Sequence, residues 1–267
     1  MNMDFSRMAR IPKRIRQDLK IIGLTSNWKE ILGAKSSNRP FLSIRFRDGV
    51  VLNSPQEVTL NFLFHEIWID EIYAPAGYEI RDNDVVFDIG GNIGVFALYA
   101  ATRAKGVKVH AFEPFPRNAE FFERNLAESK LKNVEFNNLA VASEAGERVL
   151  HVEDQWIKHS LTDKTGETDD SEGITVRCTT LDAAMANIDR CDLLKLDCEG
   201  SEYEILYSSS PQTIGKIRRI VGEFHEVDDG EKNGNSLRKF LELNNFKIDF
   251  FEKLEGNSGI ICAERRS

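Results

Sequence analysis

Val85-Val86-Phe87-Asp88-Ile89-Gly90-Gly91-Asn92-Ile93-Gly94, followed by the apolar run of residues 95–101, is the stretch that decides the fold. An apolar, β-branched start, an acid, closely spaced glycines and an apolar continuation predict a buried strand, a tight turn and a helix. Units of this kind commonly bind a nucleotide. The dinucleotide fingerprint G-x-G-x-x-G does not apply, because Asn92 stands where its second glycine would be.

Two carboxylates mark the ends of the first two predicted strands. Asp88 lies two residues before the first glycine, so it is expected to face the crevice where open α/β sheets bind ligands, and it would suit an ammonium group. The second strand, residues 107–112, is followed by Glu113-Pro114. A carboxylate there can accept hydrogen bonds from both ribose hydroxyls, and an ionised acceptor makes those bonds stronger.

These residues resemble class I S-adenosylmethionine-dependent methyltransferases, and more narrowly those of the FkbM type. The resemblance covers approximately residues 78–265. It rests on four motifs in this order: Asp88-x-Gly90-x-Asn92-x-Gly94, Phe112-Glu113-Pro114, Thr180-Leu181-Asp182 and Lys195-Leu196-Asp197-Cys198-Glu199-Gly200-Ser201-Glu202.

The resemblance implies S-adenosyl-L-methionine as the cofactor. It also implies a Rossmann-like, doubly wound α/β sheet of seven strands in the order 3-2-1-4-5-7-6. For Asn138, which the resemblance places near the adenine, the capping of a turn is an equally open interpretation. The implied cofactor-binding residues are Asp88, Gly90, Asn92, Gly94, Glu113, Pro114 and Asn138.

The composition is that of a globular protein, with 41% hydrophobic and 29% charged residues in a chain of 267. A net charge of −8 disfavours a protein that must neutralise many phosphates, so a nucleic-acid substrate is not expected. Four cysteines without C-x-x-C spacing predict buried free thiols and no zinc site. Because neither a signal-peptide apolar region nor a membrane-spanning run is present, we expect a cytoplasmic protein.

We expect two parts: an N-terminal segment, residues 1–77, for acceptor binding or oligomerisation, and a methyltransferase domain, residues 78–267. The start of the segment reads as a basic amphipathic helix. Such a helix either touches a membrane surface or an acidic acceptor, or packs its stripe on the core or on a second subunit. The narrow stripe and Pro12 favour packing. The stripe consists of Met8, Ile11, Ile15, Leu19 and Ile22.

Two further elements are expected in the N-terminal segment. Residues 41–52 alternate around Asp48-Gly49, which predicts a hairpin. Residues 60–73 are rich in aromatic side chains and should fold onto the domain that follows. Trp68 is expected in the core, whereas His65 is either a core residue or part of an acceptor pocket.

Strands and helices then alternate, as in a parallel doubly wound sheet. Between residues 142 and 179 the alternation breaks, and residues 148–152 and 174–178 predict a hairpin pair around a polar loop, residues 160–173. This loop is either a lid over the cofactor or an ordinary surface insertion. His159, just before it, is expected at the surface. The predicted core elements are strands 85–88, 107–113, 134–141, 192–197 and 217–225, helices 93–103, 117–130, 181–188 and 237–241, and an antiparallel pair, 246–251 and 259–263.

The fourth and fifth core strands supply the candidates for chemistry. A period of two places Lys195, Asp197 and Glu199 on one face, with the two acids at the carboxyl end and Lys195 deeper, paired with a carboxylate. The same parity places Glu223 and His225 together at the neighbouring carboxyl end. The candidate catalytic residues are Asp197, Glu199 and His225.

Three interpretations of this cluster stay open. In the first, His225 or Asp197 is the general base that takes the proton of an acceptor hydroxyl. In the second, Asp197 and Glu199 bind Mg²⁺ through oxygen ligands. In the third, the cluster is a structural ion network that orders the following turn and caps the next helix through Ser201 and Glu202.

The expected function is that of an S-adenosylmethionine-dependent O-methyltransferase acting on a hydroxyl of a sugar, glycan, glycolipid or secondary metabolite. The acceptor class is implied by the resemblance alone. One alternative is an RNA or protein N-methyltransferase, for which an N/D-P-P-Y-type motif would argue. That motif is absent, since the sequence contains no Pro-Pro pair. Another is a partner subunit that binds the cofactor without catalysis, against which the presence of Asp197, Glu199 and His225 speaks.

Overall fold

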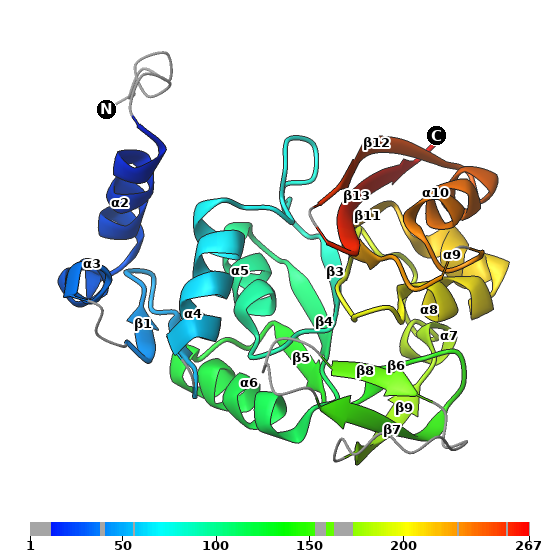
Figure 1. The fold of residues 1–267 in the computed structure, drawn as a ribbon, viewed down its shortest axis with the longest axis horizontal. Helices are drawn as coiled ribbons and strands as arrows, with labels where there is room; N and C mark the ends of the chain where they lie inside the picture. The colour runs from blue at the N-terminus through cyan, green and yellow to red at the C-terminus, as the bar shows by residue number, and fades with distance from the viewer. Residues whose placement is uncertain are drawn as a thin grey trace.

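The computed structural model describes residues 12–37, 41–55, 57–152, 159–162, 173–228, 230–254 and 256–266, and its architecture is Rossmann-like α/β (Figure 1). A central seven-stranded sheet runs in the order β12-β13-β11-β10-β3-β4-β5. Numbered along the chain and read from the other edge, this order is 3-2-1-4-5-7-6, so the predicted topology is confirmed. The strands are β3 (Val85–Ile89), β4 (Lys108–Phe112), β5 (Val134–Asn137), β10 (Leu193–Leu196), β11 (Arg219–His225), β12 (Phe246–Lys253) and β13 (Ser258–Arg265).

The strands from β11 to β5 are parallel, and β13 runs antiparallel between β11 and β12. The register places Asp88 of β3 beside Lys195 of β10, and Lys195 beside Val221 of β11. Parallel neighbours end at the same edge of a sheet. The residues that follow β3, β4, β10 and β11 therefore meet at one carboxyl edge, where such folds bind ligands.

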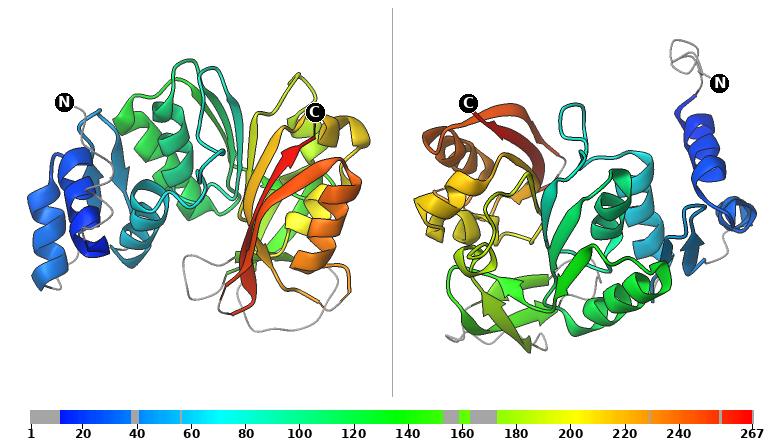
Figure 2. Two further views of the ribbon diagram at one scale, coloured as in Figure 1. Left: turned by 90° about the horizontal axis from the view of Figure 1, so that it is seen from above. Right: turned by 180° about the vertical axis from the view of Figure 1, so that it is seen from behind.

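Helices cover both faces of the sheet (Figures 1 and 2). On one face lie α5 (Val95–Arg103) and α6 (Pro116–Ser129); α5 is buried from Val95 to Ala101 because it is sandwiched between the sheet and the N-terminal segment. On the other face lie α7 (Leu181–Ala184), α8 (Glu202–Ser208), α9 (Pro211–Lys216) and α10 (Gly234–Leu243). No helix in the described part of the chain is long and apolar enough to span a membrane.

The Thr180-Leu181-Asp182 motif holds two of these helices together. The Thr180 hydroxyl accepts a hydrogen bond from the Ala183 amide and so caps α7. The Asp182 carboxylate accepts the amide and the hydroxyl of Ser210, each at 3.0 Å, at the start of α9. These bonds lower the pKa of Asp182, together with one from Thr213 that contributes most. The motif therefore has a structural role.

The N-terminal segment differs from the single helix expected at its start. It contains two helices, α2 (Lys13–Leu24) and α3 (Trp28–Ser37). The helix breaks at Thr25, which is extended and forms a β-bridge with Phe46. Pro12 immediately precedes α2, a position where its missing N–H costs no helical hydrogen bond.

The predicted apolar stripe of α2 is only partly buried. Ile21, outside the stripe, is fully buried, whereas Ile15 and Leu19 are each 49% exposed. Polar contacts also attach α2 to the end of η1 (His65–Ile69). The Lys20 ammonium donates to the Ile69 carbonyl, and the Gln17 side-chain amide donates to the Asp70 carboxylate. Two members of the stripe lie outside the described residues, Met8 and Ile11.

The predicted hairpin is confirmed as β1 (Ser43–Arg45) and β2 (Val51–Asn53), with Gly49 at φ +99° in its turn. Next, α4 (Glu57–Phe64) passes into the π-helix η1 (His65–Ile69). Trp68 is buried as predicted and stacks near Phe46, while His65 is half-buried and packs on Phe64. One hydrophobic core joins this segment to α5 and β3, so it crosses the boundary at residue 78; the division into two parts stays a prediction.

A second, four-stranded sheet has the order β6-β9-β7-β8. The predicted pairing of residues 148–152 with 174–178 is confirmed by β7 (Gly146–Val152) and β9 (Gly173–Thr179). The third core strand, however, does not run continuously from 134 to 141: it splits into β5 of the central sheet and β6 (Ala140–Val141) of the second sheet. His159 begins β8 (His159–Thr162), and residues 163–172 of the predicted lid lie outside the described residues.

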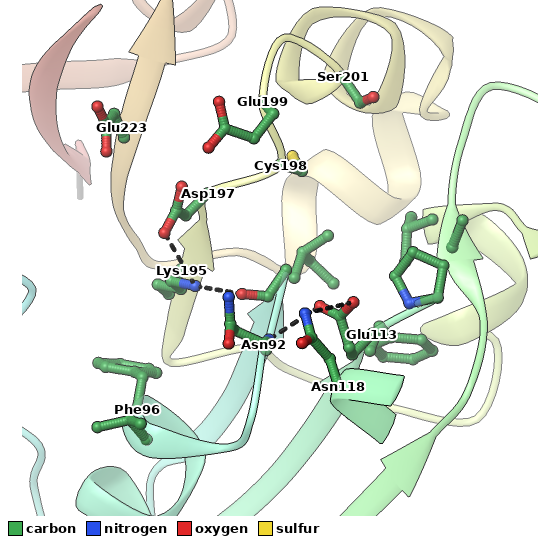
Figure 3. A pocket seen from close by; sticks show the side chains of 18 of the residues that line it. Asn92, Phe96, Glu113, Asn118, Lys195, Asp197, Cys198, Glu199, Ser201 and Glu223 are labelled. Carbon is green, nitrogen blue, oxygen red and sulfur yellow. Dashed lines mark hydrogen bonds and ion pairs between the residues drawn. The ribbon is translucent and has the colours of Figure 1, made fainter. Parts of the chain in front are cut away.

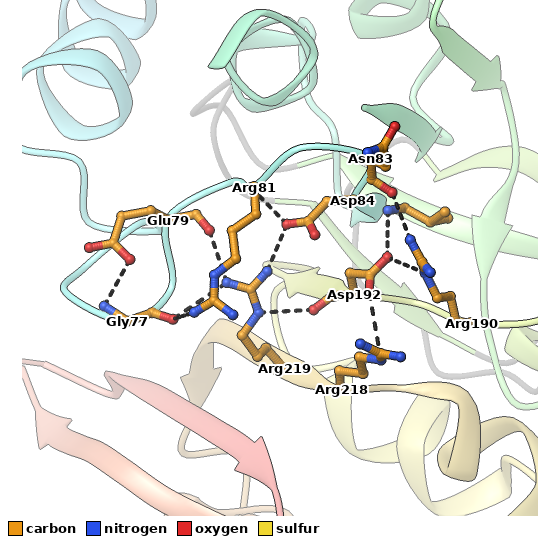
Figure 4. Close-up of polar contacts among 10 residues, drawn as sticks. Gly77, Glu79, Arg81, Asn83, Asp84, Arg190, Asp192, Arg218 and Arg219 are labelled. Atoms are coloured by element: carbon orange, nitrogen blue, oxygen red, sulfur yellow. Dashed lines mark hydrogen bonds and ion pairs between the residues drawn. The ribbon is translucent and has the colours of Figure 1, made fainter. Parts of the chain in front are cut away.

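An ion network closes the opposite, amino edge of the sheet (Figure 4). The Arg219 side chain is 3% exposed, and its guanidinium lies 2.7 Å from the Asp84 carboxylate and also donates to the carbonyls of Asp192 and Glu79. Asp192 in turn accepts the Val85 amide. Because these bonds join the starts of β3, β10 and β11, they hold the sheet together at its amino edge.

Candidate active site

One pocket lies at the carboxyl edge of the central sheet, with an empty volume of about 1180 Å³ including its mouth. Figure 3 shows Glu113 and Asn118 at one end and Asp197, Glu199 and Glu223 at the other.

The glycine turn forms the floor of the pocket. Gly90 and Gly91 both donate their amides to the Phe112 carbonyl, which fixes the turn between β3 and β4. A Cβ atom on Gly90 would lie 1.8 Å from the Asp197 carbonyl oxygen, and its φ is +79°. Only glycine fits there. Gly94, at φ +88°, is the N-cap of α5 and does not line the pocket.

Glu113 lines the pocket at the tip of β4 although its side chain is buried. Its carboxylate accepts the Asn92 amide at 2.9 Å and the Phe115 amide at 3.0 Å. Burial outweighs these bonds and raises the pKa of Glu113 to about 7. Its Oε1 also accepts the Asn118 side-chain amide at 3.4 Å, whereas Oε2, which accepts the Asn92 amide, keeps acceptor capacity for a ligand hydroxyl. Pro114 also lines the pocket, as expected from the second motif.

Asp88 is fully buried and does not line the pocket. Its carboxylate lies 3.1 Å from the Lys195 ammonium, which also donates to the Gly90 carbonyl at 2.7 Å and lies 3.6 Å from Asp197. Burial favours the neutral amine, but Asp88 and Asp197 outweigh it and raise the pKa of Lys195. The predicted pairing of Lys195 with a carboxylate is confirmed. Because Asp88 does not line the pocket, it would act on a cofactor ammonium only through the residues between them.

Asn138 is exposed and lies outside the pocket lining. Its amide donates to the carbonyls of Glu113 and Pro114, at 2.8 and 3.2 Å. These are the bonds of a turn-capping residue, and they lie where the third core strand breaks between β5 and β6. The neighbouring Leu139, Ala140 and Val141 line the pocket instead.

Asp197 and Glu199 both reach the pocket, but they do so differently. Asp197 directly follows β10, and its carboxylate accepts the Tyr73 hydroxyl at 3.0 Å. Glu199 has left the strand and has φ +49°, an unusual conformation for a side-chain-bearing residue that carries strain of about 1 kcal/mol or more. Gly200 follows at φ +98°, so a tight turn, rather than strand periodicity, aims Glu199 into the pocket.

His225, the last residue of β11, sits between acids. Its Nδ1 lies 2.8 Å from the fully buried Glu202 carboxylate, and its Nε2 lies 3.2 Å from Glu199 and 3.9 Å from Glu223. Burial would lower the pKa of His225, but the hydrogen bonds to Glu199 and Glu202 raise it to about 10. The ring is therefore an imidazolium at neutral pH, which makes it a proton donor and not a free base.

Glu202 also orders the turn before α8. Its carboxylate accepts the amides of Gly200 and His225, at 2.9 and 2.8 Å. Ser201, by contrast, makes no side-chain capping bond at the N-cap of α8. The predicted structural network thus exists through Glu202, while Asp197, Glu199 and Glu223 remain available in the pocket.

Two site residues from the N-terminal segment escaped prediction, Glu66 of η1 and Tyr73. Glu66 lines the pocket, and the hydroxyl of the buried Tyr73 meets Asp197. The signal present in the sequence was an acid, Glu66, within the otherwise apolar and aromatic residues 60–73. Helical periodicity alone could not predict the direction of the Glu66 side chain, because Glu66 lies in a π-helix.

Comparison with known proteins decides the family. Residues 88–248, more than half of the 267, match the family model described as the methyltransferase FkbM domain. The chain belongs to the FkbM methyltransferase family. It is 28% identical over 218 residues to the 31-O-demethyl-FK506 methyltransferase FkbM of Streptomyces tacrolimicus, covering 70% of this chain and 82% of that protein. Methyltransferase 1 of Beauveria bassiana is 25% identical over 218 residues, covering 74% and 86%.

Solved structures similar to this FkbM family member are more distant. An rRNA methylase from Streptococcus thermophilus aligns with a TM-score of 0.44 at 11% identity, over 80% of this chain and 98% of that one. An S-adenosylmethionine-dependent methyltransferase from Aquifex aeolicus aligns with a TM-score of 0.36 at 10% identity, over 69% and 83%. The chain is a methyltransferase, and membership of the FkbM family implies S-adenosylmethionine as its cofactor.

The pocket fits that cofactor. Glu113 would offer a buried carboxylate to the ribose hydroxyls at one end, and the glycine turn, with Gly90, Gly91 and Asn92 in the lining, would present backbone to the cofactor. An apolar wall beside Glu113 suits a flat aromatic base; it consists of Phe112, Leu139, Ala140, Val141 and Leu150. When bound, the cofactor supplies a methyl group on a positively charged sulfur.

Nothing in the described part of the chain supports the Mg²⁺ hypothesis. Within the described residues, no group of three or more His, Cys, Asp or Glu side chains is arranged to hold a metal ion. Asp197 already faces the Lys195 ammonium, and Glu199 faces the His225 imidazolium. No step of the reaction is therefore assigned to a metal.

Proposed function

We propose that this FkbM family member is an O-methyltransferase whose acceptor is a hydroxyl of a sugar, glycan, glycolipid or secondary metabolite. The observation that supports the proposal is the end of the pocket opposite Glu113. The carboxylates of Asp197, Glu199 and Glu223 line that end, where the acceptor would bind. Carboxylates accept hydrogen bonds from hydroxyl groups, and an aliphatic hydroxyl needs an acceptor for its proton. The Streptomyces relative is named for a demethylated oxygen, which supports an oxygen acceptor.

The proposed roles follow from the contacts. Gly90, Asn92, Glu113 and Pro114 hold the cofactor, with Gly94 and Asp88 fixing the turn from outside the pocket. At the acceptor end, Asp197, Glu199 and the His225 imidazolium form a charged frame that orients the acceptor hydroxyl. The N-terminal segment, residues 1–77, completes that end through Glu66 and Tyr73.

A screen with methyl-labelled S-adenosylmethionine tests the proposal. Sugars, glycans, glycolipids and hydroxylated secondary metabolites are offered in parallel with RNA and protein. The expected product is a methyl ether on a hydroxyl acceptor. Label on RNA or protein nitrogen would replace the proposal with the N-methyltransferase alternative. No transfer to any acceptor, with a melting temperature that S-adenosylhomocysteine still raises, would support a non-catalytic partner subunit.

A further inference from the structure

The carboxyl group of Glu66 enters the pocket from a segment of unusual backbone. It belongs to η1 (His65–Ile69), a π-helix whose last turn is closed by the Asp70 amide bonding to the His65 carbonyl at 2.7 Å. The Glu66 carbonyl accepts the Ile72 amide at 3.1 Å. The turn is anchored by buried Ile67, Trp68 and Ile69. Single π-turns recur at functional sites because the extra residue re-aims a side chain.

Glu66 differs from the other acids of the pocket in its partners. Asp197 accepts the Tyr73 hydroxyl and faces Lys195, and Glu199 faces His225. Glu223 is hydrogen-bonded by Ser258 and lies 3.9 Å from His225. Among the described residues, no donor hydrogen-bonds to the Glu66 carboxyl group. It is thus the pocket acid without a hydrogen-bond donor in the described part of the chain.

The charged groups that face Glu66 come from two neighbouring strands. Asp197 and Lys195 lie at the end of β10, and Glu223 lies on β11; the Tyr73 hydroxyl lies beyond η1. The cations of the other helices packed on η1 contact different atoms: Lys20 of α2 bonds to the Ile69 carbonyl, and Arg103 of α5 stacks on Trp68. Burial, Asp197 and Glu223 raise the pKa of Glu66 to about 8, against the opposing effect of Lys195.

We propose that Glu66 is the catalytic base of this site, and that the positive charge of the bound methyl donor converts its carboxyl group into the carboxylate that accepts the proton. The inference rests on the proposed O-methyl transfer. The acceptor oxygen forms a bond to the methyl carbon as the carbon–sulfur bond breaks, the electron pair of that bond stays on sulfur, and the hydroxyl proton passes to Glu66.

The charge changes of the reaction favour transfer of the proton from the acceptor hydroxyl to Glu66. A sulfonium in the pocket favours the ionised carboxylate, so binding of the methyl donor lowers the pKa of Glu66 and releases its proton. Methyl transfer converts the sulfonium into a neutral thioether. The pKa of Glu66 then rises again, and the carboxyl group holds the proton of the hydroxyl. His225, already protonated, and Asp197, already hydrogen-bonded by Tyr73, position the acceptor.

Proton release on binding tests the inference without any acceptor. S-adenosylmethionine and S-adenosylhomocysteine are each titrated into the full chain at pH 7.5, by calorimetry in two buffers of different ionisation enthalpy. With S-adenosylmethionine we expect the wild type to release about half a proton more than Glu66→Gln does, given a group near pKa 8. With S-adenosylhomocysteine the two proteins should agree. The same proton count for both proteins with both ligands would overturn the inference.

Activity with an acceptor from the screen provides the second test. Glu66→Gln should lower kcat by about 10²–10⁴-fold and remove the alkaline rise of the pH–rate profile, while Glu66→Asp restores part of both. The control is Glu71→Gln, because Glu71 lies in the same segment but outside the pocket, paired with Lys20. Near-normal kcat in Glu66→Gln would refute the base role and leave methyl transfer intact. A failed acceptor screen would refute the proposed function, while the calorimetry would still report on Glu66.

Discussion

The Lys195 ammonium lies 3.1 Å from the Asp88 carboxylate in a place where neither side chain is more than 3% exposed. Lys195 connects the glycine turn, through the Gly90 carbonyl, to Asp197 at the acceptor end. The two halves of the pocket therefore share the buried ammonium of Lys195.

Replacing Lys195 by Met should destabilise the chain by about 3–5 kcal/mol, because removal of one partner leaves the Asp88 charge buried and unpaired. Urea unfolding at neutral pH measures the change. The double variant Lys195→Met/Asp88→Asn is the control, and it should recover much of the loss since the orphaned charge is gone. Equal stability of wild type and Lys195→Met would contradict the assignment of a buried ion pair.

Gly90→Ala should abolish cofactor binding or folding, since the added Cβ atom would overlap the Asp197 carbonyl and the backbone is left-handed. Gly215→Ala is the matched control: Gly215 lies in α9 with nothing within 4 Å of the added carbon. That change should be neutral or stabilise by up to about 1 kcal/mol. Melting temperatures with and without S-adenosylhomocysteine distinguish the two. A Gly90→Ala protein that binds normally would show that the turn can shift.

Affinity for S-adenosylhomocysteine should depend on pH through Glu113. Its pKa is raised to about 7 in the free protein, and ribose hydroxyls bond best to the ionised form. Affinity should therefore fall as the pH drops below about 7 and level off above it. Calorimetric titration between pH 6 and 8.5 measures the trend. Glu113→Gln should bind more weakly with a flat profile, and a wild-type affinity independent of pH would remove Glu113 from the ribose contact.

The His225 imidazolium should stabilise the fold most at neutral and acidic pH. Its folded pKa, about 10, exceeds the usual value near 6.5, so the stabilisation is fully present below 6.5 and is lost as the pH rises through 10. His225→Gln should cost about 1.5–3 kcal/mol at pH 6, the range for hydrogen bonds to charged groups. The gap between the two unfolding free energies should shrink by pH 10.5. A gap of constant size would mean that the ring is neutral throughout.

Excess chelator should leave methyl transfer unchanged, because Asp197 and Glu199 already face Lys195 and His225. Turnover with and without chelator, at saturating cofactor and acceptor, measures this. Added Mg²⁺ serves as the matched condition, and it too should have no effect. Activity that disappears with chelator and returns with Mg²⁺ would revive the metal hypothesis.

Sequence patterns predicted the core strands and the pocket edge because buried parallel strands leave strong apolar runs, and the acids at their ends stand out. They placed Asp197 and His225 together for the same reason. The order of the strands was implied by the family resemblance and not by these patterns. Glu199 reached the pocket through a left-handed turn and not through the strand parity that suggested it. The side-chain amide of Asn138 donates to the backbone carbonyl of Glu113, which follows the neighbouring strand β4. This contact depends on the tertiary fold and could not be predicted from the local sequence.

Protonation states were also hidden from the sequence. A histidine near acids is a plausible base on composition alone, but the opposite role follows once Glu199 and Glu202 are seen on its two nitrogens. Glu66 lies far from β10 in the chain, and only the tertiary fold brings it beside Asp197. Long-range electrostatics of this kind requires coordinates.

The Tyr73 hydroxyl on Asp197 has a consequence for evolution and engineering. A segment that only selected the acceptor could be exchanged between relatives like a detachable module. Here the same segment supplies a hydrogen-bond donor to the acid after β10, and its Trp68 and Phe64 belong to the core that supports α5. A chimaera with a foreign N-terminal segment would inherit a different acceptor site and, at the same time, a different electrostatic setting for the reaction.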